Sequence, residues 1–155
     1  MGPPGHIAIA FAAKPAAPKA SLWILMVATE ILDLLCFGFL AAGIERAGAE
    51  PSLPWSHGLF MSVVWSATAG VIALLFYRDR RTSIVIGLLV FSHWVLDFIS
   101  HAPDLPLLFN GSPLVGLGLE NSLAVGLIME LSLLAGGIAI YLITRKRKTN
   151  DCTST

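Results

Sequence analysis

Residues 83–101 read SIVIGLLVFSHWVLDFISH, and this segment decides how the rest of the chain is organised. Its first half is almost purely apolar, and its second half carries His93, Asp97 and His101 at intervals of four residues. In a helix of 3.6 residues per turn, this spacing keeps the three side chains on one face, with a drift of about 80°. Two imidazoles beside a carboxylate can bind a divalent metal ion. They also suit a helix interface with a capping Asp, so the rest of the chain has to decide.

The composition is that of a membrane protein. Of the 155 residues, 55% are hydrophobic and 13% are charged, about half the charged fraction of a soluble domain, and the mean hydropathy is +0.77. The formal net charge is zero, so nothing in the composition favours a nucleic-acid partner. The two cysteines, Cys36 and Cys152, predict neither a disulfide framework nor a zinc finger.

Four apolar runs approach or exceed the roughly 20 residues that a helix needs to cross a bilayer. They are residues 21–43, 55–77, 83–101 and about 121–144. A fifth run, residues 7–13, is too short to span and lacks the features of a signal peptide, so we expect a short helix that lies on the membrane or re-enters it. The sequence therefore predicts an all-α integral membrane protein, a four-helix bundle with a short N-terminal interfacial or re-entrant helix. Residues 1–148 form one domain and residues 149–155 a polar tail.

The basic residues predict the orientation of this bundle. Nine of the ten lie before the first span, between the second and third, or after the fourth: Lys14, Lys19, Arg78, Arg80, Arg81, Arg145, Lys146, Arg147 and Lys148. These three places share one side, and the opposite loops hold only Arg46. By the positive-inside rule, both termini are expected in the cytoplasm.

Several polar residues within the spans are predicted to meet. At 1.5 Å per residue, Glu30 and Asp33 of the first span, His93 and Asp97 of the third, and Glu130 of the fourth lie between the bilayer midplane and its outer surface. His57, in the motif Trp55-Ser56-His57, begins the second span at that same side. No Lys or Arg lies within a span, and an unpaired carboxylate in hydrocarbon costs several kcal/mol or becomes protonated. A hydrogen bond between helices accounts equally well for Glu130 alone, but a bound cation explains the whole set better.

The chain also resembles a known family. The motifs are His6, Glu30-x-x-Asp33, Trp55-Ser56-His57 and the block Ser92-His93-Trp94-x-x-Asp97-x-x-Ser100-His101-x-Pro103-Asp104-Leu105-Pro106. They look like the bacterial inner-membrane metal-dependent hydrolases described as LexA-regulated or LexA-binding, whose small members are often labelled membrane proteins or permeases. The resemblance implies a multi-pass protein of the inner (plasma) membrane with the metal ligands His6, Asp33, His57, His93, Asp97 and His101. The chain departs from the pattern at Ala102, where a basic residue is familiar.

His6 precedes Lys14 and so starts on the predicted cytoplasmic side, away from His57 and His101. A helix of seven to nine residues rises only about 10 to 14 Å, so His6 approaches the midplane if this segment re-enters the bundle. Pro3, Pro4 and Gly5 suit such a turn. Otherwise His6 is a surface residue.

The chemistry expected of this site is hydrolysis. A divalent metal, most simply zinc, lowers the pKa of a bound water, and Glu30 or Glu130 would take the proton as general base. Ser56, Ser92 and Ser100 each adjoin a histidine, but neighbours on a helix point apart, which weakens any serine mechanism. Residues 102–120 can cover the site as a lid or lie flat in the interface. We expect membrane lipids around the protein and an amphipathic or lipid-like substrate.

Two other classes of function stay open. The same residues would suit a small cation or proton transporter, or a metal-stabilised scaffold without turnover. Transporters usually show internal repeats and polar groups leading to both faces. This sequence shows no repeat, and residues 71–76 and 133–143 are apolar at the cytoplasmic ends of their spans. An enzyme with a site open to the outside therefore fits better than a transporter.

Overall fold

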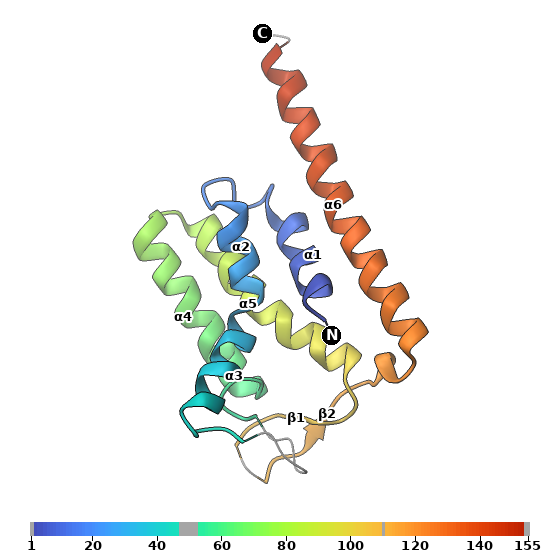
Figure 1. Ribbon diagram of the computed structural model, residues 1–155. Helices are drawn as coiled ribbons and strands as arrows, with labels where there is room; N and C mark the ends of the chain where they lie inside the picture. The colour runs from blue at the N-terminus through green and yellow to red at the C-terminus, as the bar shows by residue number, and fades with distance from the viewer. Residues whose placement is uncertain (1, 47–52, 110, 154–155) are drawn as a thin grey trace.

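The computed structural model describes residues 2–46, 53–109 and 111–153, and it is predominantly helical (Figure 1). The helices are α1 (Pro3–Ala13), α2 (Leu22–Thr29), α3 (Ile31–Ala41), α4 (Leu59–Tyr77), α5 (Arg80–Ser100) and α6 (Leu123–Thr153). Between α5 and α6 lie two short antiparallel strands, β1 (Leu105–Pro106) and β2 (Leu114–Val115), and a 3₁₀ turn, η1 (Leu119–Asn121).

The predicted all-α membrane bundle is confirmed. Among the described residues, α4, α5 and the part of α6 from Leu123 to Arg147 are long and apolar enough to cross a membrane, and the bent pair α2–α3 can serve as a fourth span. Large apolar side chains point outward from these helices, with Trp23, Phe76 and Leu123 largely exposed. An apolar exterior of this kind is what a lipid surrounding requires.

The first span is not the continuous helix that the sequence predicted for residues 21–43. It breaks at Glu30, where φ is −102° and ψ is 5°, and α2 and α3 meet at an angle of 54°. The last carbonyls of a helix have no partner within it. Here the carbonyl of Thr29, at the end of α2, accepts a hydrogen bond from His93 Nδ1 at 2.6 Å. This hydrogen bond from His93 satisfies a carbonyl that would bond within α2–α3 if the helix were continuous. Because the span is bent, the depths in the membrane that a straight helix predicts for Glu30 and Asp33 do not hold.

Three further boundaries differ from the prediction. Helix α4 begins at Leu59 because residues 54–57 form a turn whose backbone N–H groups bond to Glu45. Helix α5 begins three residues early, at Arg80, because the Asp79 side chain caps it by accepting from the N–H of Thr82 at 2.9 Å. Helix α6 continues to Thr153, so residues 149–153 of the expected polar tail belong to the helix.

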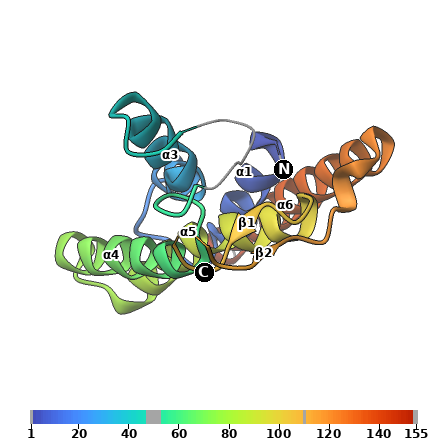
Figure 2. The same cartoon turned by 90° about the horizontal axis from the view of Figure 1, so that it is seen from below.

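Helix α5 is the centre of the packing. Viewed from below, it lies between α4 and α6, with α1 and α3 on one face of that row (Figure 2). Helix α4 packs along α5, and their backbones approach closely where Gly70 faces Gly87. Helix α6 meets the rest of the bundle mainly along α1, which also contacts α2 and α5. The core between these helices includes Leu25, Leu32 and Val90.

Helix α1 is buried in the bundle rather than lying on its surface. Its N-terminus lies beside α5 and α6 (Figure 1), and Gly5, His6, Ala8 and Ala10 are all buried. Its packing against α6 is so close that a Cβ at Gly137 would collide with the carbonyl of Ala8. Of the two arrangements expected for this segment, the buried one corresponds to re-entry, and it carries His6 to the middle of the fold.

The segment 102–120 closes one end of the bundle. Backbone bonds tie it to α4 and α5: the N–H of Phe60 donates to Leu107 O at 3.1 Å, and the N–H of Leu117 donates to Phe98 O at 2.8 Å. Leu105 is buried among these contacts. The loop is therefore packed against the helix ends next to His101.

Candidate metal centre

Five of the predicted site residues meet at the centre of the fold. They are His6 from α1, Asp33 from α3, His57 from the turn before α4, and His93 and Asp97 from α5. Helix α5 supplies two of them because residues four apart share a helix face. The bend at Glu30 brings in Asp33, the burial of α1 brings in His6, and the turn before α4 brings in His57.

Asp33 lies against two of the histidines. Its Oδ1 atom is 3.2 Å from His57 Nε2 and 3.5 Å from His93 Nε2. The Asp33 side chain is 37% exposed, whereas that of His93 is 1% exposed. Asp33 therefore lies where the buried cluster opens outward.

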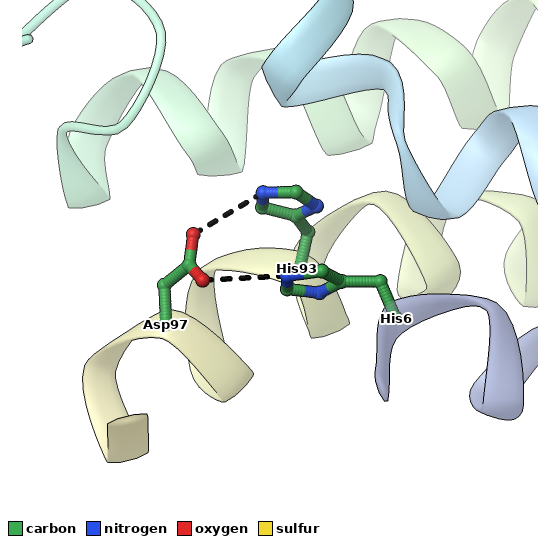
Figure 3. A group of neighbouring side chains, drawn as sticks. All are labelled: His6, His93 and Asp97. Atoms are coloured by element: carbon green, nitrogen blue, oxygen red, sulfur yellow. Dashed lines mark ion pairs between the residues drawn. The ribbon is translucent and has the colours of Figure 1, made fainter. Parts of the chain in front are cut away.

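Asp97 uses both of its carboxylate oxygens. Oδ1 is 3.3 Å from His6 Nε2, and Oδ2 is 3.2 Å from His93 Nε2 and 3.7 Å from His57 Nε2. Figure 3 shows the two oxygens directed at different rings, with the imidazoles of His6 and His93 stacked on each other. All three side chains of this figure are almost completely buried.

Hydrogen bonds fix which nitrogen of two histidines carries the proton. His93 Nδ1 must donate to the carbonyl of Thr29, since a carbonyl only accepts. Ser56 Oγ donates to Glu45 Oε2 at 2.8 Å, so it accepts from His57 Nδ1 at 2.9 Å. In both neutral rings the remaining nitrogen, Nε2, then has a lone pair and no proton.

These lone pairs face carboxylate oxygens, which are also only acceptors. His93 Nε2 makes no hydrogen bond within the described part of the chain, although it is 3.2 Å from Asp97 Oδ2. Such a contact requires a positive charge between or on the two groups, either an added proton or a metal ion. The His and Asp donors suit a divalent metal, and Nδ1–H bonds to a carbonyl or a hydroxyl are the usual outer support of metal-bound histidines. The buried cluster can therefore hold a metal ion.

The other three predicted site residues occupy different positions. Glu30 is half-buried at the break between α2 and α3, and its carboxylate interacts electrostatically with His6, His93 and both aspartates. His101 is at the edge, with Nε2 3.7 Å from Asp97 Oδ1. Glu130 is not brought to the cluster: its carboxylate accepts from the N–H of Gly2 at the start of α1. A negative charge there favours the helix N-terminus, so Glu130 supports the helix that carries His6.

A pocket of about 220 Å³ adjoins the cluster. Asp33, His57, His101 and Asp104 line its polar wall, and Leu53, Leu105 and Pro106 contribute the apolar one. Segment 102–120 thus forms one side of the pocket. A small polar group attached to an apolar body would fit these two walls.

Sequence reasoning missed the support of His57. Glu45 lies in an expected loop, yet it is buried and accepts three hydrogen bonds, from the N–H groups of Trp55 and Ser56 and from the Ser56 hydroxyl. Ser56 and His57 do not point apart as helical neighbours, as the sequence predicted, because they lie in a turn before α4 and their side chains are hydrogen-bonded. Nothing in the sequence distinguishes Glu45 from other loop acids.

Comparison with protein-family models, curated proteins and solved structures gave no match.

Proposed function

We propose that this protein is a membrane-embedded, metal-dependent hydrolase. The observation that carries the proposal is the meeting of two Nε2 lone pairs, of His57 and His93, with the carboxylates of Asp33 and Asp97. A divalent cation satisfies all four groups at once. The resemblance of the block from Ser92 to Pro106 to membrane metal-dependent hydrolases supports hydrolysis as the reaction.

Zinc is the metal that we propose for this centre. It accepts mixed nitrogen and oxygen ligands at about 2.0 to 2.2 Å. Two donors on one tetrahedral zinc are then roughly 3.4 Å apart, from the bond length and the tetrahedral angle. The separation of 3.2 Å between His93 Nε2 and Asp97 Oδ2 is close to this value.

We propose separate catalytic roles for the polar residues at the cluster. When bound, a divalent metal acidifies a water ligand so that hydroxide forms near neutral pH. Glu30 is the acid that we propose as proton acceptor, because it adjoins the cluster and its Oε1 makes no hydrogen bond among the described residues. Glu130 is not proposed for this role because its carboxylate is engaged by Gly2. The partly exposed Asp33 would orient the reacting group at the mouth of the pocket.

The proposed substrate is amphipathic or lipid-like. The pocket has a polar wall at Asp33 and an apolar wall at Leu105 and Pro106, so a headgroup ester would place its polar part at the centre. We propose that the protein acts in the bacterial inner membrane, with both termini in the cytoplasm and the pocket on the outer side.

Hydrolysis of a panel of lipid and headgroup esters by protein purified in detergent tests this function. We expect turnover that a chelator abolishes and added zinc restores, and a loss of at least about 100-fold in Glu30→Gln, within the range of general-base catalysis. Ser92→Ala is the matched control, because the Ser92 hydroxyl bonds the carbonyl of Leu89 within α5, away from the cluster. No turnover on the panel, together with cation flux into liposomes that contain the protein, would favour transport instead.

A further inference from the structure

The rings of His6 and His93 do not point at a common position. Their centroids are 3.9 Å apart and their planes differ by only 9°. The lone pair of an imidazole nitrogen lies in the plane of its ring, so the ligand bonds from these two stacked rings lie in two nearly parallel planes, one above the other. One ion at about 2.1 Å from both Nε2 atoms would lie far out of at least one ring plane. In this arrangement, the Nε2 atoms of His6 and His93 can bind metal ions at two separate positions.

Asp97 is placed to serve both positions. Its Oδ1 is 3.3 Å from His6 Nε2, and its Oδ2 is 3.2 Å from His93 Nε2 (Figure 3). A carboxylate with each oxygen opposite a different imidazole can bridge two cations. Hydrolytic two-metal sites hold their ions about 3.5–4 Å apart, which matches the separation of the stacked rings.

Each position has further donors on its own side. Beside Oδ1, His101 Nε2 lies 3.7 Å away, and its Nδ1 is 3.7 Å from Asp104 Oδ1, an outer carboxylate of the kind that often supports metal-bound histidines. On the other side, His57 Nε2 lies 3.7 Å from Asp97 Oδ2 and 3.2 Å from Asp33 Oδ1. These separations bracket the roughly 3.4 Å expected for two donors on one zinc ion.

We propose that the centre binds two divalent ions bridged by Asp97. His6, His101 and Asp97 Oδ1 hold the first ion, and Asp33, His57, His93 and Asp97 Oδ2 hold the second. The six side chains exceed the four ligands usual for one zinc ion, and the bridging carboxylate distributes them between two. The burial of α1 is then explained by metal binding, because α1 supplies His6 as a ligand of the first ion. This inference rests on the metal centre of the proposed function and adds a second ion to it.

The test is the metal stoichiometry of the full chain in detergent, stripped with a chelator and dialysed against Zn²⁺. We expect two zinc ions per wild-type chain, as in other two-metal hydrolytic sites, and one per chain in His6→Ala. Ser92→Ala, on the same helix as His93, should keep both ions. Loading with Mn²⁺ gives a second readout, because two ions bridged by one carboxylate show an exchange-coupled electron paramagnetic resonance spectrum.

Each outcome separates this inference from the proposed function. One ion per wild-type chain with ester hydrolysis would overturn the second ion and leave the hydrolase standing. Two coupled ions without turnover would support the inference and count against the hydrolase. Two ions retained in His6→Ala would overturn the assignment of His6. If that variant does not fold, a wild-type spectrum of isolated Mn²⁺ alone would overturn the bridged pair.

Discussion

Glu45 determines, through Ser56, which nitrogen of His57 carries the proton, and His57 is a proposed metal ligand that Glu45 does not touch. Its Oε1 accepts the N–H groups of Trp55 at 2.8 Å and Ser56 at 3.0 Å, and its Oε2 accepts the Ser56 hydroxyl at 2.8 Å. The Ser56 oxygen must then accept the proton on His57 Nδ1. In the neutral ring, His57 Nε2 therefore has no proton and presents its lone pair to Asp33.

Replacing Glu45 with Gln reverses this chain of hydrogen bonds. The amide oxygen of Gln takes the two backbone N–H groups, so its NH₂ group faces Ser56. The Ser56 hydroxyl then accepts from Gln and turns its own proton toward His57 Nδ1, which moves the proton of the ring to Nε2. Changes in such outer contacts reduce metal affinity by about 10- to 100-fold. We expect this loss in Glu45→Gln, equivalent to about 1.4 to 2.7 kcal/mol.

Zinc affinity, measured by competition with a chromophoric chelator in detergent, checks this prediction. The same substitution at Glu120, in η1 near the start of α6, is the control and should leave the affinity unchanged. Equal affinities of Glu45→Gln and wild type would show that Glu45 does not determine the position of the His57 proton. An equal loss in Glu120→Gln would show that the effect is not specific to the Ser56 relay.

Three further predictions address the fold. Gly137→Ala should destabilise the fold by about 1 to 3 kcal/mol through overpacking and so lower the thermal midpoint, because its Cβ meets the carbonyl of Ala8. Gly136→Ala has open space and should raise stability by up to about 1 kcal/mol; equal midpoints of the two variants would contradict the packing of α1 on α6. The hydroxyl and N–H of Thr82, and then Lys19, lower the pKa of Asp79 to about 2, so the stabilising effect of its ionised form is complete above about pH 4 and is lost as the pH falls through 2. Asp79→Asn should therefore melt below wild type at pH 7, with the gap closing between pH 4 and pH 2; a gap independent of pH would refute this. A reporter fused after Thr155 should be active in the cytoplasm, and activity only in the periplasm would reverse the orientation.

The helical content could be predicted because it follows from apolar length. Most of the runs 55–77 and 83–101, namely residues 59–77 and 83–100, form helices as expected in lipid, where backbone groups must bond within their own segment. The same rule fails at Glu30, where a polar side chain of another helix, His93, takes up a free carbonyl. A contact between residues so far apart in sequence leaves no local trace, so the 54° bend could not be predicted.

The candidate site could be predicted in part for the same reason. His93 and Asp97 lie on one face of one helix, so their proximity follows from sequence spacing alone. The arrival of His6 depends on how α1 packs against α6, which the short apolar run does not specify. Glu130 was expected at the depth of the cluster, but its side chain contacts Gly2 instead. Depth along a span does not determine which face of the helix turns toward the cluster.

In the function that we propose, the cluster of His and Asp side chains binds a divalent metal. The most direct test is the metal content of purified wild-type protein after equilibration with zinc, compared with His93→Ala, Asp97→Ala and the control Ser92→Ala. We expect bound zinc in wild type and Ser92→Ala, and a strong loss in both site variants. Equal zinc in all four proteins, or no zinc in wild type, would contradict it.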